Sequence, residues 1–131
     1  MIVLDASAAV DFLIAFSPAA GPLDVRVGSV PEVHVPELFE LEVLSALRGL
    51  ERGARVEPSR LAAALWRFDG LRAVTWPHAE LRSRIWAQRH RLSIYDASYA
   101  ALAHQLDLPL VTTDARLAAG VEAGTAVELY E

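Results

Sequence analysis

The chain has 131 residues, with 12 basic and 17 acidic side chains, a formal net charge of −5 and no cysteine. This length fits a single domain, and the absence of cysteine excludes a disulfide framework, a zinc–thiolate site and a thiol nucleophile. All the basic side chains counted here are arginines, which excludes a Walker-type phosphate loop and Schiff-base chemistry, because both require a lysine.

Short apolar segments alternate with longer stretches of helical periodicity along the whole chain. Prolines at possible first helical positions favour helix starts at Pro36, Pro58 and Pro77. In chain order we expect a strand at 2–4, a helix at 7–16, a short helical turn within 22–30, a strand at 33–35, helices at 36–52 and 58–69, a strand at 73–75, helices at 77–90 and 93–106, a strand at 110–112, a helix at 115–119 and a strand at 126–129.

This alternation predicts an α/β fold, with a mainly parallel sheet of about five strands and helices on both faces. The segment that begins at Met1 has no basic flank before an apolar stretch, and no apolar run is long enough to span a bilayer. We therefore expect a cytoplasmic protein that does not associate with membranes.

Four acidic residues are placed where they could meet at one edge of this sheet. Ligands of open parallel sheets bind beyond the carboxyl ends of the strands, where the strand order reverses. Asp5 and Asp114 each follow a predicted strand. Asp96 lies in the first turn of a helix, and Glu42 lies on the inward side of the helix after the second strand. Clustered carboxylates repel one another unless a cation binds, and oxygen ligands alone favour Mg²⁺ or Mn²⁺ over zinc.

Each acid also has a purely structural interpretation. Asp5 and Asp114 occupy positions at which aspartate commonly caps a helix. Ser93 and Asp96 have the spacing of a capping box. A carboxylate at the position of Glu42, among small and apolar residues, could be paired with an arginine.

Four segments carry a family resemblance through their order and separation. They are Asp5–Ser7, Glu42–Arg48, Tyr95–Ala103 and Leu110–Leu117. Together they resemble the PIN domain, and within it the VapC-type toxin ribonucleases of bacterial toxin–antitoxin pairs. The resemblance covers the whole chain, which we therefore interpret as a single PIN domain over residues 1–131. The stretch 21–31 departs from the family pattern, which has a clearer second helix there.

The resemblance implies a three-layer sandwich and a set of functional residues. It implies that Asp5, Glu42, Asp96 and Asp114 form a Mg²⁺ site at which Mn²⁺ can substitute. It also implies a metal-dependent endonuclease that cleaves RNA with water and leaves 5′-phosphate and 3′-hydroxyl ends. Ser7 and Thr112 match polar positions beside the site in the family, although hydrogen bonding at helix ends explains them equally well. The implied partners are RNA, a VapB-type antitoxin and a second copy of the chain.

Arginines are the side chains that could hold the RNA. Four of them lie close together before Asp96, with Trp86 and His90 among them, and these are Arg82, Arg84, Arg89 and Arg91. Arginine binds phosphates with two hydrogen bonds and stacks on bases, so we interpret this group as an RNA-facing patch. The alternative is a solvated face on which the arginine stems cover apolar surface. Arg116 lies two positions after Asp114 and could contact the scissile phosphate or pair with a site carboxylate.

The antitoxin and the second copy would need surfaces of their own. The tail of the antitoxin could lie along the groove and place an arginine in the acidic pocket. On the helix that carries Glu42, Leu44 and Leu47 point away from that residue, and they could form a dimer or antitoxin face.

Three other functions compete with this interpretation. A receiver domain of a response regulator has a similar length, but it needs a lysine and an acidic pair after the first strand. A haloacid-type phosphatase needs two aspartates that flank one residue, and here the second position is Ser7. A PIN fold that no longer cuts and serves only as a binding module remains open, although the four intact acids argue against it.

Overall fold

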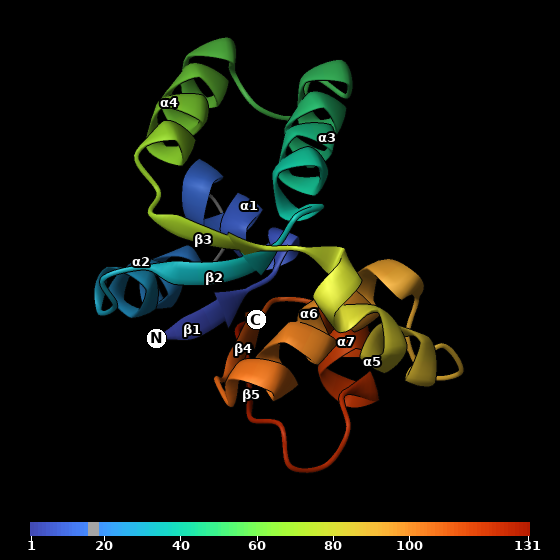
Figure 1. Cartoon of the computed structure of the whole chain (residues 1–131). Coiled ribbons are helices and arrows are strands. Elements are labelled where there is room, and N and C mark those ends of the chain that lie inside the picture. Colours follow the sequence, from blue (N-terminus) through green and yellow to red (C-terminus); the bar gives the residue numbers. More distant parts are fainter. Residues whose placement is uncertain (16–18) are drawn as a thin grey trace.

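The computed structural model describes residues 1–15 and 19–131. The end that we predict for the first helix, at Phe16, lies outside the described residues. In chain order the elements are β1 (Ile2–Leu4), α1 (Ala6–Ile14), α2 (Ala20–Gly28), β2 (Val33–Pro36), α3 (Phe39–Arg52), α4 (Pro58–Asp69), β3 (Ala73–Trp76), a 3₁₀ helix (His78–Leu81), α5 (Arg82–Ala87), α6 (Ile94–Leu106), β4 (Leu110–Thr112), α7 (Ala115–Gly120) and β5 (Val127–Leu129) (Figure 1).

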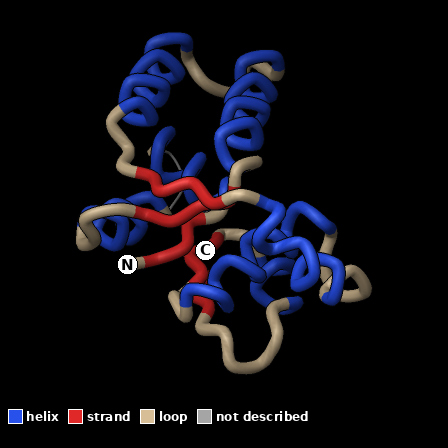
Figure 2. The backbone as a smooth tube through the Cα atoms, in the orientation of Figure 1, coloured by secondary structure: helices blue, strands red, loops and turns tan. Residues whose placement is uncertain are grey.

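The strands form one five-stranded sheet in the order β3-β2-β1-β4-β5, and every pair of neighbours is parallel (Figure 2). The chain moves outward from β1 to β2 and β3, and then crosses back to β4 on the other side of β1. The strand order therefore reverses between β1 and β4. This confirms the predicted parallel sheet and identifies the edge beyond β1 and β4 as the place for a ligand.

The direction of these crossovers decides which helices cover which face. Parallel crossovers are right-handed, so the connections from β1 to β3 place α1 to α4 on one face, and the connections from β3 to β5 place α5 to α7 on the other. Figure 1 shows α3 and α4 together at one end of the molecule and α5 to α7 grouped at the other. α1 packs on α2, α3 and α4, while α6 packs on β1, β2 and β4. The three-layer sandwich is confirmed.

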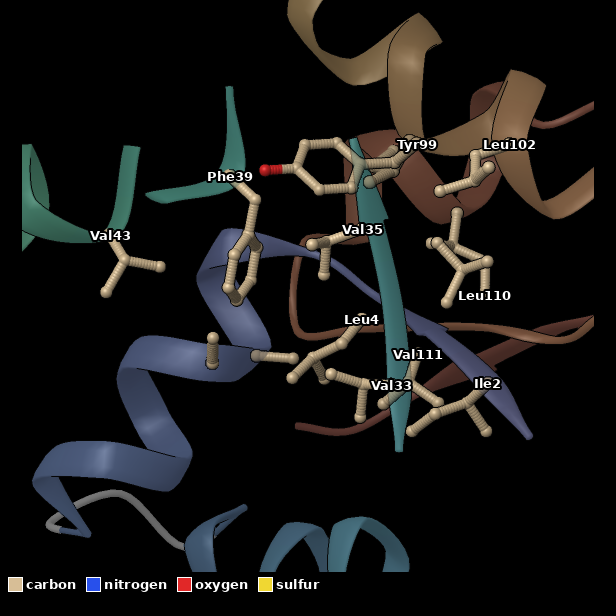
Figure 3. Close-up of a cluster of buried hydrophobic side chains, with 14 of the residues drawn as sticks. Ile2, Leu4, Val33, Val35, Phe39, Val43, Tyr99, Leu102, Leu110 and Val111 are labelled. Atoms are coloured by element: carbon tan, nitrogen blue, oxygen red, sulfur yellow. The ribbon is translucent and has the colours of Figure 1, made fainter. Parts of the chain in front are cut away.

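The core lies on both faces of the central strand. Ile2, Val3 and Leu4 of β1 are completely buried, as expected for a parallel strand covered by helices on both sides. Figure 3 shows two of these side chains packed with Val33 of β2 and Val111 of β4. This packing fixes the end of β1, and hence the position of the residue that follows it. No helix in the described part of the chain is long and apolar enough to cross a membrane.

Two of the predicted elements are wrong at their boundaries. Pro36 is the last residue of β2 rather than the start of a helix, and α3 begins only at Phe39. Pro36 faces Trp76 in the register of β2 with β3. The helix predicted over 77–90 divides into the 3₁₀ helix and α5, and turns follow it up to residue 92.

The segment that we expected to hold a short turn contains the complete helix α2. Pro22 lies in its first turn, where a backbone N–H would have no partner within the helix, so the proline does not interrupt it. Leu23 and Val27, one turn apart, bury their side chains in the core. The prediction that residues 21–31 depart from the family pattern is therefore wrong, because the structure has the second helix there.

Candidate active site

Asp5 follows β1 directly and is almost completely buried, with a side chain that is 4% exposed. Its Oδ1 accepts hydrogen bonds from the Ser7 hydroxyl at 2.6 Å and from the Ala8 N–H at 2.9 Å, which caps α1. Its Oδ2 accepts a bond from the Thr112 hydroxyl at 2.6 Å. Burial raises the pKa of Asp5, and the hydrogen bonds oppose that rise. The carboxylate is thus held rigidly at the end of the central strand.

Asp114 lies at the end of the neighbouring strand and is linked to Asp5 through Thr112. The Thr112 hydroxyl, which donates to Asp5, also accepts a bond from the Asp114 N–H at 2.9 Å. Asp114 Oδ1 accepts bonds from the N–H groups of Arg116 at 2.8 Å and Leu117 at 3.3 Å, and so caps α7. The helix-capping interpretation is therefore correct for Asp5 and Asp114, and the two carboxylates still lie beside each other at the predicted sheet edge.

Asp96 reaches the same edge from the start of α6. Its N–H donates to the Ser93 hydroxyl at 3.1 Å, so Ser93 caps the helix as predicted. The side chain is half-buried. Desolvation raises the pKa of Asp96, and the negative charges of Asp114 and Asp5 raise it further. The three aspartates therefore act on one another electrostatically.

Glu42 comes from α3, on the opposite face of the sheet from α6. Its Oε1 accepts a hydrogen bond of 2.6 Å from the hydroxyl of Tyr99, which is the partner that the structure gives it in place of the arginine we considered. Desolvation raises the pKa of Glu42, the bond from Tyr99 opposes this, and the charges of Asp96 and Asp5 add to the rise. Glu42 thus belongs to the same group of acids.

Tyr99 is a residue of this site that the sequence analysis missed. It lies three positions after Asp96 on α6, so the two residues share one face of the helix. That spacing was the available signal, but a tyrosine on a buried helix face is ordinarily a core residue. The structure shows both roles, because the ring is buried and the hydroxyl contacts Glu42.

The side-chain atoms that the site offers to a cation are all oxygens, from the four carboxylates and from the hydroxyls of Ser7, Thr112 and Tyr99. Such a set suits a hard divalent cation. Within residues 1–15 and 19–131, however, no three acidic or histidine side chains converge closely enough to form a complete metal-binding group. Desolvation raises the pKa of Asp5 and Asp96, and the charges of neighbouring acids add to the rise. Perturbed acids gathered at one edge are typical of a functional site.

The raised pKa values of Asp5, Glu42 and Asp96 give the metal-free protein a defined pH dependence. Between the ordinary carboxyl range and the raised values, the folded site keeps protons that the unfolded chain has released. The stability contributed by these groups therefore falls as the pH rises through that window. Because a cation competes with the protons, we expect added MgCl₂ to raise Tm more at about pH 8 than at about pH 5. Scanning fluorimetry at both values checks this, and an equal rise at both would contradict it.

A groove of about 900 Å³ lies among α5, the start of α6 and the segments before them, and its lining residues do not include the four acids. Its wall includes Leu38, whose carbonyl accepts the bond from the Glu42 N–H, and Tyr95, which precedes Asp96. Arg82 lines it as well. Tyr95 is 64% exposed, so its ring is accessible at the wall of the groove.

The four arginines before Asp96 do not form one uniform patch. All are exposed, but Arg84 and Arg91 lie 3.5 and 4.0 Å from the carboxylate of Glu122. Arg89 lies over the Trp86 ring, 4.5 Å from its centre. The structure therefore separates Arg82, in the groove, from the pair that shares Glu122. Arg116 is exposed next to Asp114.

One predicted surface on α3 is wrong in part. Leu44 is 41% exposed, as a residue of an interaction face would be. Leu47 is buried in the core, where the helix packs on α1. The two leucines point in different directions because α3 turns about 300° over three residues, and only Leu44 faces solvent.

Comparison with known proteins places this geometry in a family. The PIN domain family model matches residues 2–121. Ribonuclease VapC9 of Mycobacterium tuberculosis is 39% identical over 117 residues, which cover 89% of this chain and 88% of that protein. Ribonuclease VapC12 of the same species is 34% identical over 118 residues, which cover 90% of each chain.

Two solved structures share the fold. PAE2754 from Pyrobaculum aerophilum superimposes with a TM-score of 0.66 and 24% identity, over 96% of this chain and 81% of that one. VapC20 of Mycobacterium tuberculosis, described as a sarcin–ricin loop cleaving toxin, gives a TM-score of 0.66 and 22% identity over the full length of both chains. With the family match and relatives above 30% identity along nearly their whole length, the chain belongs to the PIN domain family and, within it, to the VapC ribonucleases.

Proposed function

We propose that this chain is a Mg²⁺-dependent endoribonuclease and the toxin of a type II toxin–antitoxin pair. The observation that carries the proposal is the gathering of four acids, with three raised pKa values, at the edge where the strand order reverses. The ribonuclease names of relatives such as VapC9 support it. These acids are Asp5, Glu42, Asp96 and Asp114.

The residues of the site fit distinct roles in this reaction. The four acids would hold Mg²⁺, or Mn²⁺ in its place, which lowers the pKa of a bound water and neutralises charge on the phosphodiester. Ser7 and Thr112 fix the Asp5 carboxylate through their hydroxyls. Arg116, exposed beside Asp114, can contact the scissile phosphate. Attack by water then leaves a 5′-phosphate and a 3′-hydroxyl.

The proposed activity needs control, and the acidic pocket offers a means. A VapB-type antitoxin whose tail places an arginine among the acids would neutralise their charges and block access to RNA. The exposed Leu44 on α3 suits a contact with the antitoxin or with a second copy of the chain in a homodimer. Because the proposed substrate is cellular RNA, we expect the protein to act in the cytoplasm.

Charge reversal at Arg89 and Arg91 is expected to weaken RNA binding by about 10-fold or more and to flatten its salt dependence, since each lost phosphate contact lowers the salt slope by about one. Filter binding at several salt concentrations, in an Asp5→Asn background that prevents cleavage, measures both. The matched control reverses Arg48 and Arg52, two exposed arginines of α3. Unchanged affinity and slope in the Arg89/Arg91 variant would remove these residues from the RNA surface.

Growth upon induced expression tests the proposed function in the cell. The wild-type chain should arrest growth, and Asp5→Asn and Asp96→Asn should each restore it at equal protein levels. Co-expression of a cognate VapB-type antitoxin should also restore growth. Toxicity that survives both substitutions would exclude a metal-dependent nuclease and favour a PIN-fold binding module.

A further inference from the structure

Tyr99 joins two helices that otherwise contribute separately to the acidic site. It lies on α6 with a side chain that is 2% exposed. In Figure 3 its hydroxyl points toward the side on which Phe39, at the start of α3, is drawn. The hydroxyl donates to Glu42 Oε1 at 2.6 Å. Because α3 and α6 cover opposite faces of the sheet, this bond crosses the carboxyl edge where the acids meet.

Glu42 needs such a contact more than the aspartates do. Asp5 and Asp114 are held by backbone N–H groups of the helices that they cap. Glu42 has a longer side chain, lies within a helix that packs on α1, and is repelled by the charges of Asp96 and Asp5. Without a fixed partner, rotation and repulsion would move its carboxylate away from the other acids.

The Tyr99 hydroxyl is well suited to this task. A tyrosine hydroxyl ordinarily has a pKa of about 10, so it remains a donor at physiological pH. A hydrogen bond to a charged carboxylate is stronger than one between neutral groups. With Oε1 engaged, Glu42 still has Oε2 to offer a cation.

We propose that Tyr99 is a positioning residue, whose hydroxyl keeps the Glu42 carboxylate at the sheet edge that carries Asp5 and Asp96, so that Oε2 is available to a divalent cation bound there. The inference rests on the proposed function, since it assumes that these acids bind such an ion. Hydrogen-bond partners of metal-binding side chains typically account for about 10- to 100-fold in metal affinity or activity. Tyr99 should therefore matter for metal binding more than for folding.

The test is a Mn²⁺ titration followed by electron paramagnetic resonance, with Tyr99→Phe compared to the wild type. The variant keeps the buried ring and loses only the hydroxyl, so we expect Mn²⁺ affinity to fall by about 10-fold. In RNA cleavage kcat should fall more than KM rises. Tyr130→Phe is the matched control, because its hydroxyl also donates to a glutamate, Glu128, at 3.1 Å, outside the acidic group. It should bind Mn²⁺ as the wild type does.

A double-mutant comparison separates positioning from general damage. If Tyr99 acts through Glu42, then Tyr99→Phe should cause no further loss of Mn²⁺ affinity in a Glu42→Gln background. Glu42→Asp is a second variant that tests the same contact, at a position that is half-buried. It keeps the charge but withdraws the carboxylate from Tyr99, and should weaken Mn²⁺ binding by a similar factor.

The outcomes distinguish this inference from the proposed function. Wild-type protein with no saturable Mn²⁺ binding, or with binding that Asp5→Asn does not weaken, would overturn the proposed function itself. Wild-type binding that Tyr99→Phe and Glu42→Asp both leave unchanged would overturn only the role of Tyr99. The role of Tyr99 would also be overturned if Tyr99→Phe lowered Mn²⁺ affinity by the same factor in the wild-type and Glu42→Gln backgrounds.

Discussion

Replacement of Asp5 by asparagine is expected to lower Mg²⁺-dependent RNA cleavage by at least about 100-fold, since even the partners of metal-binding side chains account for about 10- to 100-fold. Asp5 occupies the centre of the acidic group, at the end of β1, and its charge acts on Asp96, Glu42 and Tyr99. Asparagine removes the negative charge and replaces one oxygen by an NH₂ group, which cannot bind a cation.

The same substitution should leave the fold intact. The asparagine oxygen can still accept the bonds from Ser7 and the Ala8 N–H, and the Thr112 hydroxyl can turn to accept from the new NH₂ group. Circular dichroism and Tm should therefore remain close to those of the wild type. Asp107→Asn is the control, because Asp107 has a left-handed backbone conformation that asparagine tolerates and lies outside the site. Cleavage by folded Asp5→Asn protein at the wild-type rate would contradict the assignment.

Replacement of Asp96 by asparagine should separate activity from stability. Cleavage should fall by about 100-fold or more, as for Asp5, because a second carboxylate is lost from the cation site. In chelator at neutral pH, however, the Tm of this variant should exceed that of the wild type by a few degrees. The pKa of Asp96 is raised in the fold, so its ionised form is less favourable there than in the unfolded chain. Asparagine removes this unfavourable charge.

The pH dependence of that Tm difference provides its control. The advantage of Asp96→Asn should shrink as the pH falls through the ordinary aspartate range and disappear below about pH 3, where the wild-type carboxyl is protonated in both states. Glu40→Gln removes an exposed acid from the first turn of α3 without relieving repulsion, so its Tm should stay unchanged or fall slightly. A metal-free Asp96→Asn protein that melts below the wild type at neutral pH would show that Asp96 is not under electrostatic strain.

The strands could be predicted because they are short segments rich in apolar residues, and several contain β-branched residues, as Ile2 and Val3 of β1 do. Helix boundaries were less predictable. Pro36 fits the first turn of a helix and the end of a strand equally well, and pairing with Trp76 of β3 decides between them. The full length of α2, which we expected only as a short helical turn, could not be predicted because Gly21 and Pro22 at its start are typical of turns. The burial of Leu23 and Val27, which stabilises the helix, is a tertiary effect.

Of the candidate site, the sequence predicts the elements that carry the acids but not the contacts between them. Asp5 and Asp114 follow from the ends of strands, and Glu42 from its phase on a helix. The bond between Tyr99 and Glu42 joins residues 57 positions apart, and no local pattern encodes it. The pairing of Arg84 and Arg91 with Glu122 likewise depends on how the segment after α7 passes α5.

The central claim is that these acids hold a cation that makes water the nucleophile on RNA. The most direct test is the identity of the ends that the purified protein produces from RNA, with Mg²⁺ present and with chelator. The account predicts cleavage only with the cation, and products with a 5′-phosphate and a 3′-hydroxyl. Cleavage that continues in chelator, or products that end in a 2′,3′-cyclic phosphate, would contradict it, since the RNA 2′-hydroxyl rather than water would then be the nucleophile.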